Sequence, residues 1–136
     1  MVMSLATDLI VYLDALVSET AGTDLFEGPS VELPDNTVIV THYGGEAVQD
    51  RTMGASLTTS GVEVGSVQVL VRNTVMATAL TRAEVIHALL DNFNGTWNSR
   101  TILQCISING MPFSMGTDKL GRFRYVANFR VQFIRP

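Results

Sequence analysis

The sequence contains few of the residues that build common catalytic or metal-binding sites. It has one cysteine, Cys105, and two histidines, His42 and His87, and neither histidine has a metal-ligand partner at a recognisable spacing. We find no nucleophile elbow, phosphate-binding loop or pair of carboxylates with catalytic spacing. Gly44-Gly45 lacks the third glycine of a dinucleotide-binding motif. The sequence therefore predicts a protein that is not an enzyme and holds no metal or cofactor, and a small enzyme or ligand-binding domain remains the alternative.

A disulfide framework and a long hydrophobic segment are also missing. One cysteine cannot form an intramolecular disulfide, and its place inside an apolar run favours a buried hydrophobic role for Cys105. Residues 1–17 lack a basic region and carry Asp8 and Asp14, so they match neither a signal peptide nor a membrane span. We therefore expect a protein of a reducing compartment without a membrane partner.

Lysine is nearly absent, and the charges are unevenly distributed along the chain. Residues 1–65 hold ten acidic residues and one arginine, a net charge of −9, whereas residues 66–136 hold eight basic and three acidic residues, a net charge of +5. Such asymmetry is typical of pairing between the two halves of a chain, or of opposite faces that meet in an assembly. The overall charge of −4 argues against a nucleic-acid-binding protein.

The most regular stretch, residues 66–95, predicts a buried strand followed by a long amphipathic helix. Valines alternate with polar residues over 67–71, which is the period of a strand with one buried face. From Met76 to Phe93, apolar residues recur at steps of three and four, which is the spacing of one helical stripe. Asn94-Gly95 then suits the end of this helix.

Two starting points are open for this helix. Asn73 or Thr74 can cap an early start, since a short side-chain oxygen accepts from a free backbone N–H. Thr81 and Glu84 have the spacing of a capping box and would mark a later start. We prefer the earlier start because Met76 already belongs to the helical stripe.

The N-terminal third predicts a second helix and two strands. A helix capped by Ser4 runs to about Ala21 and ends at Gly22. Leu25–Glu27 is a short edge strand, and Thr37–Tyr43 is a second strand that follows a turn. Three polar residues are expected on the solvent side of the helix: Asp8, Asp14 and Ser18.

Residues 44–65 are the least regular part of the chain. They contain five glycines and several threonines and serines, which favours a long loop or arm, or a poorly packed hairpin. A loop of this length in a compact domain is usually functional. The rest of the length fits one core, so we predict a single domain over residues 1–136.

The C-terminal third predicts strands joined by tight turns. Thr101–Ile108 follows a strand and a helix, so it is expected to run parallel to the 67–71 strand in one sheet. Asn109-Gly110 is a strong hairpin signal, and residues 111–115 are expected to pair back. Asp118–Gly121 suits a type I turn closed by glycine.

The last strand, residues 122–133, has the clearest alternation in the sequence. Its aromatic and apolar residues point one way, toward the core. Arg122, Arg124 and Arg130 point the other way and form a basic stripe, without the interleaved aromatic residues of a single-strand nucleic-acid binder. We interpret this stripe as a solvated face or a contact with an acidic neighbour. The predicted fold class is α+β, with a mixed, mostly antiparallel β-sheet and two α-helices packed on one face.

The order of several short motifs resembles that of a known family. An N-terminal helix precedes VIVTHYGG at 38–45, VQVLVR at 67–72 and an alanine-rich helix that contains IHALL at 86–90. INGMP at 108–112, GTDKLGR at 116–122 and NFRV at 128–131 follow. This order resembles the tail terminator or minor capsid (neck) proteins of long-tailed bacteriophages, over residues 5–134 except 46–64.

The resemblance implies a structural virion protein of the phage neck or tail, made in the cytoplasm of the host bacterium, with no catalysis and no cofactor. It implies a ring, usually a hexamer, that caps the tail tube and joins it to the head connector. The implied partners are other copies of the chain, the tail tube protein and the connector or stopper protein. Genomic DNA would pass through the channel without specific binding. A stopper-type neck or tail-completion protein is the alternative.

The glycine-rich segment and the basic stripe supply the candidate contacts with a neighbouring subunit or the tail tube. If the acidic residues of the first half line the channel, they would repel DNA phosphates and let the genome slide. The candidate contact residues are Gly44, Gly45, Arg51, Met53, Leu57, Arg122, Arg124 and Arg130.

Overall fold

The computed structural model describes residues 5–16, 25–28, 35–47 and 62–134. The elements in chain order are α1 (Leu5–Asp14), β1 (Leu25–Glu27), β2 (Thr37–Ala47), β3 (Val62–Asn73), α2 (Met76–Leu90), β4 (Phe93–Trp97), β5 (Arg100–Ser107), β6 (Phe113–Thr117) and β7 (Phe123–Ile134). The strands form one sheet in the order β1-β2-β3-β7-β5-β4, and β6 also pairs with β7.

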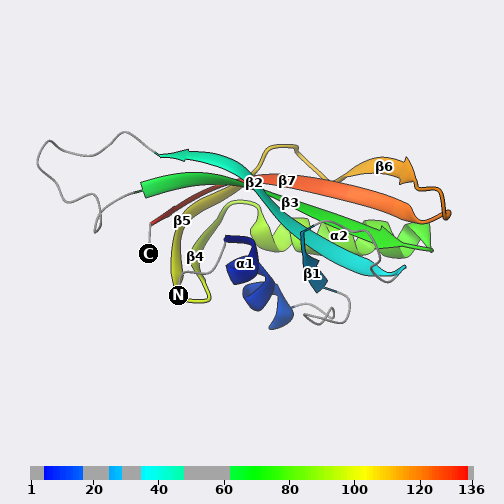
Figure 1. Ribbon diagram of the computed structural model, residues 1–136, viewed down its shortest axis with the longest axis horizontal. Helices are drawn as coiled ribbons and strands as arrows, with labels where there is room; N and C mark the ends of the chain where they lie inside the picture. The colour runs from blue at the N-terminus through cyan, green and yellow to red at the C-terminus, as the bar shows by residue number, and fades with distance from the viewer. Residues whose placement is uncertain (1–4, 17–24, 29–34, 48–61, 135–136) are drawn as a thin grey trace, which may run out of the picture.

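Both helices lie on the same face of this sheet (Figure 1). The pair β1–β2 is parallel, and the other described pairs are antiparallel. The predicted α+β fold, with a mixed and mostly antiparallel sheet and two helices on one face, is therefore confirmed.

Strand β7 pairs with other strands along both of its edges. One edge pairs with β3 along all of its residues. The other edge is shared, because β6 pairs with the stretch from Phe123 to Val126 and β5 pairs with the stretch from Phe129 to Phe133. The alternation predicted for this strand is confirmed, since Phe129, Val131 and Phe133 are buried on the helix side.

The connection from β3 to α2 follows the sequence pattern. The Asn73 side-chain oxygen accepts a hydrogen bond from the backbone N–H of Val75 at 2.9 Å, and the helix starts immediately afterwards. The early start is therefore confirmed. The predicted end is wrong, because the helix stops at Leu90 and Asn92 adopts a left-handed conformation with φ of 58°. The chain then forms β4, which we did not predict.

The crossover prediction is confirmed, whereas the hairpin prediction is wrong. β3 and β5 both run antiparallel to β7, so they point in the same direction with β7 between them. Asn109-Gly110 does not join a hairpin, because β6 pairs with β7 instead of folding back on β5. The predicted turn at Asp118–Gly121 forms, with the Gly121 N–H donating to the Asp118 carbonyl at 3.0 Å.

The N-terminal helix differs from its prediction in two ways. The helix ends at Asp14 and residues 15–16 form a turn, so the predicted helix to about Ala21 is wrong; residues 17–24, including Ser18 and Ala21, lie outside the described part of the chain. Asp14 is exposed as expected, but Asp8 is only 4% exposed, so its predicted place on the solvent side is wrong. β1 forms at the sheet edge as predicted.

The predicted loop at 44–65 is partly strand. Gly44 and Gly45 belong to β2, and Gly45 lies opposite Gly65 of β3 after a shift in register. The antiparallel pairing of β2 with β3 agrees with the hairpin alternative for this segment. Residues 48–61 lie outside the described residues, and the single domain over 1–136 stays a prediction.

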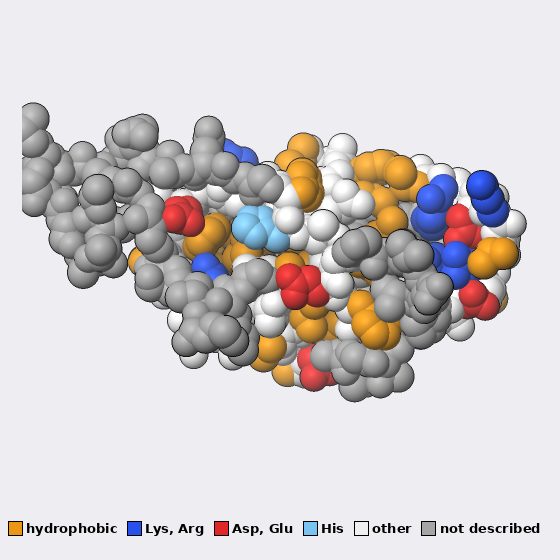
Figure 2. Space-filling view, viewed as in Figure 1, with side chains coloured by type: hydrophobic (Ala, Val, Ile, Leu, Met, Phe, Trp, Pro, Cys, Tyr) orange, Lys and Arg blue, Asp and Glu red, His pale blue; other side chains and the backbone are white. Residues whose placement is uncertain are grey.

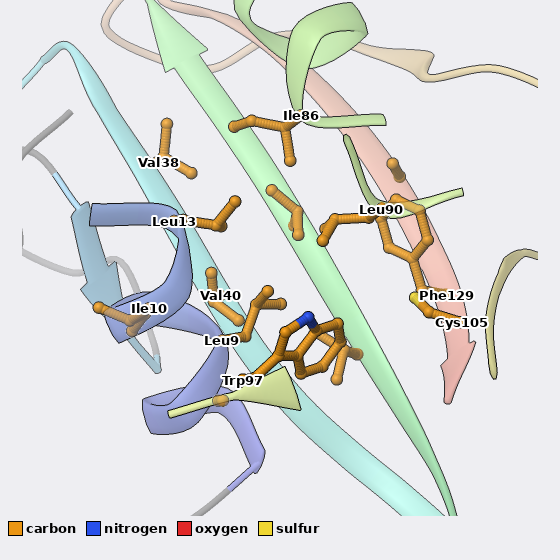
Figure 3. Packing of buried hydrophobic residues seen from close by; sticks show 14 of the residues in the cluster. Leu9, Ile10, Leu13, Val38, Val40, Ile86, Leu90, Trp97, Cys105 and Phe129 are labelled. Atoms are coloured by element: carbon orange, nitrogen blue, oxygen red, sulfur yellow. The ribbon is translucent and has the colours of Figure 1, made fainter. Parts of the chain in front are cut away.

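The core lies between the sheet and the two helices. Side chains from α1, α2, β2 and β7 fill this layer around Trp97, which is fully buried (Figure 3). α2 contributes two small buried residues, Ala79 and Ala83, before Ile86 and Leu90. The opposite face of the sheet carries no helix among the described residues (Figure 1), but Ile39, Val64 and Val126, which alternate with the residues of the core cluster, are also buried.

Candidate assembly surfaces

Arg122 lies at one end of the sheet and is already engaged by two carboxylates. Its Nε donates to Asp118 Oδ2 at 2.7 Å, and its Nη1 donates to Asp35 Oδ1 at 3.2 Å. The Arg122 side chain is 14% exposed. A guanidinium held in this way connects the residues just before β2 to the turn between β6 and β7.

The carboxylate of Asp118 organises this turn. It accepts hydrogen bonds from the backbone N–H groups of Leu120 and Arg122 and from the Arg122 side chain. Desolvation alone raises the pKa of Asp118, but these hydrogen bonds and the positive charge outweigh it, so the pKa lies below its usual value. The ionised form is therefore the one that stabilises the turn.

Two further arginines complete a charged group at this end, which we name the arginine cluster (Arg72, Arg122, Arg124, Asp35 and Asp118). Arg124 Nη2 donates to the Met115 carbonyl at 3.0 Å. Arg72 is 3% exposed, and burial together with the nearby Arg122 charge lowers its pKa. Figure 2 shows basic and acidic side chains gathered at the end where β6 and β7 meet. The cluster is largely a structural feature of the fold.

Arg130 is separate from this cluster. It lies six residues further along β7 than Arg124, roughly 20 Å away along an extended strand. It is exposed, and in the sheet it lies between Ser66 of β3 and Ile106 of β5. The three arginines that we predicted as one stripe are therefore two separate features, and Arg130 is the exposed one.

The other predicted contact residues come from the glycine-rich segment. Gly44 and Gly45 lie in β2, at the shift in its pairing with β3. Arg51, Met53 and Leu57 lie outside the described residues. Their role in contacts stays a prediction.

An exposed apolar surface was missed in the sequence analysis. We name residues 106–117 the apolar segment, because this stretch, which runs from the end of β5 through β6, contains no charged residue. Isolated exposed apolar side chains are ordinary, whereas a group of them marks an interaction surface. The available signal was the uncharged run ISINGMPFSMGT, which we interpreted as a hairpin and as part of the family motifs, but not as an exposed surface. Its exposed large side chains are Ile106, Ile108, Met111, Phe113 and Met115.

A buried ion pair was also missed. Asp8 of α1 accepts a hydrogen bond from Arg100 Nε at 2.5 Å and one from Asn98 Nδ2 at 3.1 Å. Together with the Asp35–Arg122 pair, it joins the acidic first half of the chain to the basic second half. Some of the acidic residues of the first half are therefore paired with basic residues of the second half within the same chain.

Three further features of the described part of the chain concern metal-binding clusters, membrane-spanning helices and the reactivity of the cysteine. Among the described residues, no group of three or more His, Cys, Asp or Glu side chains is arranged to hold a metal ion. None of the described helices has the length and hydropathy needed to cross a bilayer. Burial, with a smaller effect of Asp91, raises the pKa of the Cys105 thiol to about 12, so this cysteine is a weak nucleophile.

Comparison with known proteins identifies a family and a solved structure with the same fold. A family model described as bacteriophage tail terminator protein matches residues 12–134. A solved structure titled "Virion of native gene transfer agent (GTA) particle" contains a chain with the same fold, at a TM-score of 0.60, 16% identity and coverage of 96% of each chain. No curated protein matches. The chain belongs to the bacteriophage tail terminator family, whose members are structural virion proteins and not enzymes.

Proposed function

We propose that this protein is the subunit of a ring, a hexamer, that caps the phage tail tube and joins it to the head connector. The observation that carries this proposal is the family match, which covers residues 12–134. The shared fold with a chain of a virion particle supports it. In this role the protein is made in the host cytoplasm and functions in the neck of the virion as a head–tail joining, or minor capsid, component.

The partners in this role are other copies of the chain, the tail tube protein and the connector or stopper protein. Genomic DNA passes through the channel of the ring without specific binding, and acidic residues of the first half reduce its attraction to the wall. Asp8 and Asp35 do not contribute, because both are paired with arginines.

Two surfaces are our candidates for contacts in the ring. Arg130 is exposed on the outer face of the sheet and is free of the arginine cluster, which makes it the better candidate of the three predicted arginines. The segment after Gly45, with Arg51, Met53 and Leu57, would contact a neighbouring subunit or the tube.

Native mass spectrometry of the purified protein, alone and with the tail tube protein, tests the ring. We expect six copies in a closed assembly in at least one of these samples. A monomer in both would overturn the proposal. A pull-down against tube and connector proteins then separates a terminator, which binds the tube end, from a stopper, which binds the connector without the tube.

Charge reversal tests the arginine assignments. Arg130→Glu should prevent assembly and leave the thermal unfolding curve unchanged, since the side chain is exposed. Arg122→Glu should lower the melting temperature, because it breaks the pairs with Asp35 and Asp118. Arg124→Glu should have an intermediate effect both on assembly and on the melting temperature. An intact ring in the Arg130 variant would remove this residue from the interface.

A further inference from the structure

We propose that the Asn109–Gly110 peptide is a site of spontaneous covalent modification, at which Asn109 loses its side-chain amide and becomes aspartate or isoaspartate. The sequence has two Asn-Gly pairs, at 94–95 and at 109–110. Glycine after asparagine hinders this reaction least, because it has no side chain to block the approach of its backbone nitrogen. The inference does not depend on the proposed ring.

The strand pairing places this peptide outside the sheet. Ser107 of β5 lies opposite Phe129 of β7. Continuous pairing would then place Gly110 opposite Val126, but Phe113 of β6 holds that position. Three extra residues therefore project from the sheet between β5 and β6, in the connection that Figure 1 shows between these strands. A peptide in such a bulge is not fixed by the hydrogen bonds of the sheet.

Neither reacting group is held by a hydrogen bond from the described residues. In that part of the chain, the Gly110 N–H donates to no backbone carbonyl, and the Asn109 Oδ1 accepts from no donor. Gly110 is exposed, and a Cβ added to it would meet nothing within 4 Å. The side chain of Asn109 can therefore turn toward the Gly110 nitrogen without breaking a bond or displacing a neighbour.

The Ser107 hydroxyl favours the reactive form of the peptide. It donates a hydrogen bond to the Asn109 carbonyl oxygen. This oxygen belongs to the same peptide group as the Gly110 nitrogen. When that nitrogen loses its proton, the negative charge is shared with the carbonyl oxygen, and a hydrogen-bond donor at the oxygen stabilises it.

The reaction needs only water. The Gly110 nitrogen attacks Asn109 Cγ, the bond from Cγ to Nδ2 breaks, and the proton lost from the Gly110 nitrogen leaves with Nδ2 as ammonia. The resulting five-membered imide is opened by water at either of its two carbonyl carbons. Opening at Cγ gives aspartate, and opening at the main-chain carbon gives isoaspartate. No atom is oxidised or reduced.

The other Asn-Gly pair is a control within the same chain. Gly95 lies in β4 and is paired with Ile102 of β5. The Phe93 ring also covers it, because a Cβ on Gly95 would lie 3.0 Å from that ring. Asn94 can form the imide only after the strand opens locally, which lowers the population that reacts. The same dipeptide is therefore expected to react at different rates in the two places.

The modification changes the apolar segment. It adds a negative charge to residues 106–117, which contain none. The Asn109 Oδ1 is buried without a donor, and a carboxylate oxygen in that place would lack compensation for its lost hydration. The modified segment therefore has to rearrange so that the new charge reaches water.

Peptide mapping by mass spectrometry tests the site. The purified full-length protein is incubated in mildly alkaline buffer, natively and in urea, and isoaspartate is measured by enzymatic methylation. In the native protein, Asn109 should convert roughly tenfold faster than Asn94 or more, because only Asn94 needs local opening. In urea the two rates should be similar. Equal native rates, or conversion of Asn109 only after unfolding, would overturn the proposal.

Variants of Ser107 test the assistance by its hydroxyl. Ser107→Ala should slow conversion of Asn109 in the native protein by roughly tenfold, the effect of one hydrogen bond to a developing charge. The backbone N–H of this residue, which donates to Asp91, is kept in the variant. Ser107→Thr keeps the hydroxyl and should restore the rate, and the Asn94 rate should not change. An unchanged Asn109 rate in Ser107→Ala would refute the role of the hydroxyl.

Hydrogen exchange tests the rearrangement. Asn109→Asp carries the charge of the product, whereas Asn109→Gln keeps a neutral amide and is the matched control. Backbone exchange over residues 106–117 should be faster in Asn109→Asp than in the control. Equal exchange in the two variants would contradict the rearrangement.

Discussion

Replacing Asp8 with alanine should strongly destabilise the fold. The Asp8 and Arg100 side chains are only 6% and 8% exposed, so the ion pair between them lies in the interior. The pair fixes α1 to the start of β5, and the Asn98 amide donates to the same carboxylate. Removing one partner of a buried pair leaves the other charge in the interior without its carboxylate, which costs about 3–5 kcal/mol.

Thermal and urea unfolding measure this cost. For a chain of this length, each kcal/mol of lost stability lowers the melting temperature by about 3–5 °C. We therefore expect Asp8→Ala to lower the melting temperature by roughly 10 °C or more. Val11→Ala is the matched control, because Val11 is 43% exposed on the same helix and its truncation should change stability by about 0.5 kcal/mol or less.

A double-mutant cycle separates the pair from its surroundings. Arg100 also lies over the Phe133 ring, with its guanidinium carbon 5.1 Å from the ring centroid, so Arg100→Ala removes more than the ion pair. The double variant should be less destabilised than the sum of the single ones, by about 1–3 kcal/mol. Additive costs, or a cost below about 1 kcal/mol for Asp8→Ala, would refute the assignment of a stabilising buried pair.

Three further predictions concern single positions. Gly65→Ala should destabilise by about 1–3 kcal/mol in urea unfolding, because its Cβ would lie 2.9 Å from Leu5 Cδ2, whereas Gly110→Ala meets nothing within 4 Å and serves as control. Asp118 has a lowered pKa, so its contribution is fully present above the ordinary aspartate pKa of 3.8 and is lost as pH falls through the folded-state value. Asp118→Asn should remove that part of the pH dependence of stability, and an unchanged acid profile would contradict it. Cys105 should react with a thiol reagent only after unfolding, and rapid labelling of the native protein would contradict its burial.

The elements with a strong local pattern could be predicted from the sequence. β3 and the alternation of β7 depend on hydrophobic period, and the start of α2 depends on a short-range hydrogen bond from the Val75 N–H to the Asn73 side chain; both signals are readable over a few residues. The turn at Asp118–Gly121 was equally predictable, because its hydrogen bonds are local.

The errors arise where a distant partner decides the structure. Asn109-Gly110 has the composition of a hairpin turn, but β6 pairs with the free half of β7 because β7 is long enough to hold β5 and β6 in succession. Apolar Phe93 continues the helical stripe, yet it starts β4, where its ring packs against Tyr12 and Trp97. Tertiary packing overrides the local pattern in both cases.

The candidate site was harder to predict than the fold, because charge in a sequence does not reveal its partner. Arg122 and Arg130 look alike in the alternation of β7, but one is held by two carboxylates and the other is exposed. The partner of Arg100 lies 92 residues away, in a helix where Asp8 had the position of a solvent-facing residue.

The charge asymmetry is explained in part by the first of the two alternatives, pairing between the acidic and basic halves of one chain. Two described ion pairs, Asp8–Arg100 and Asp35–Arg122, cross from the acidic half to the basic half within one chain. The apolar segment, in contrast, contains no charged residue and has exposed large side chains. Apolar burial gives most of the free energy in protein association, and charges at the margin mainly set orientation and rate. The exposed apolar segment is therefore a stronger candidate for a contact surface than the charges that are paired between the two halves.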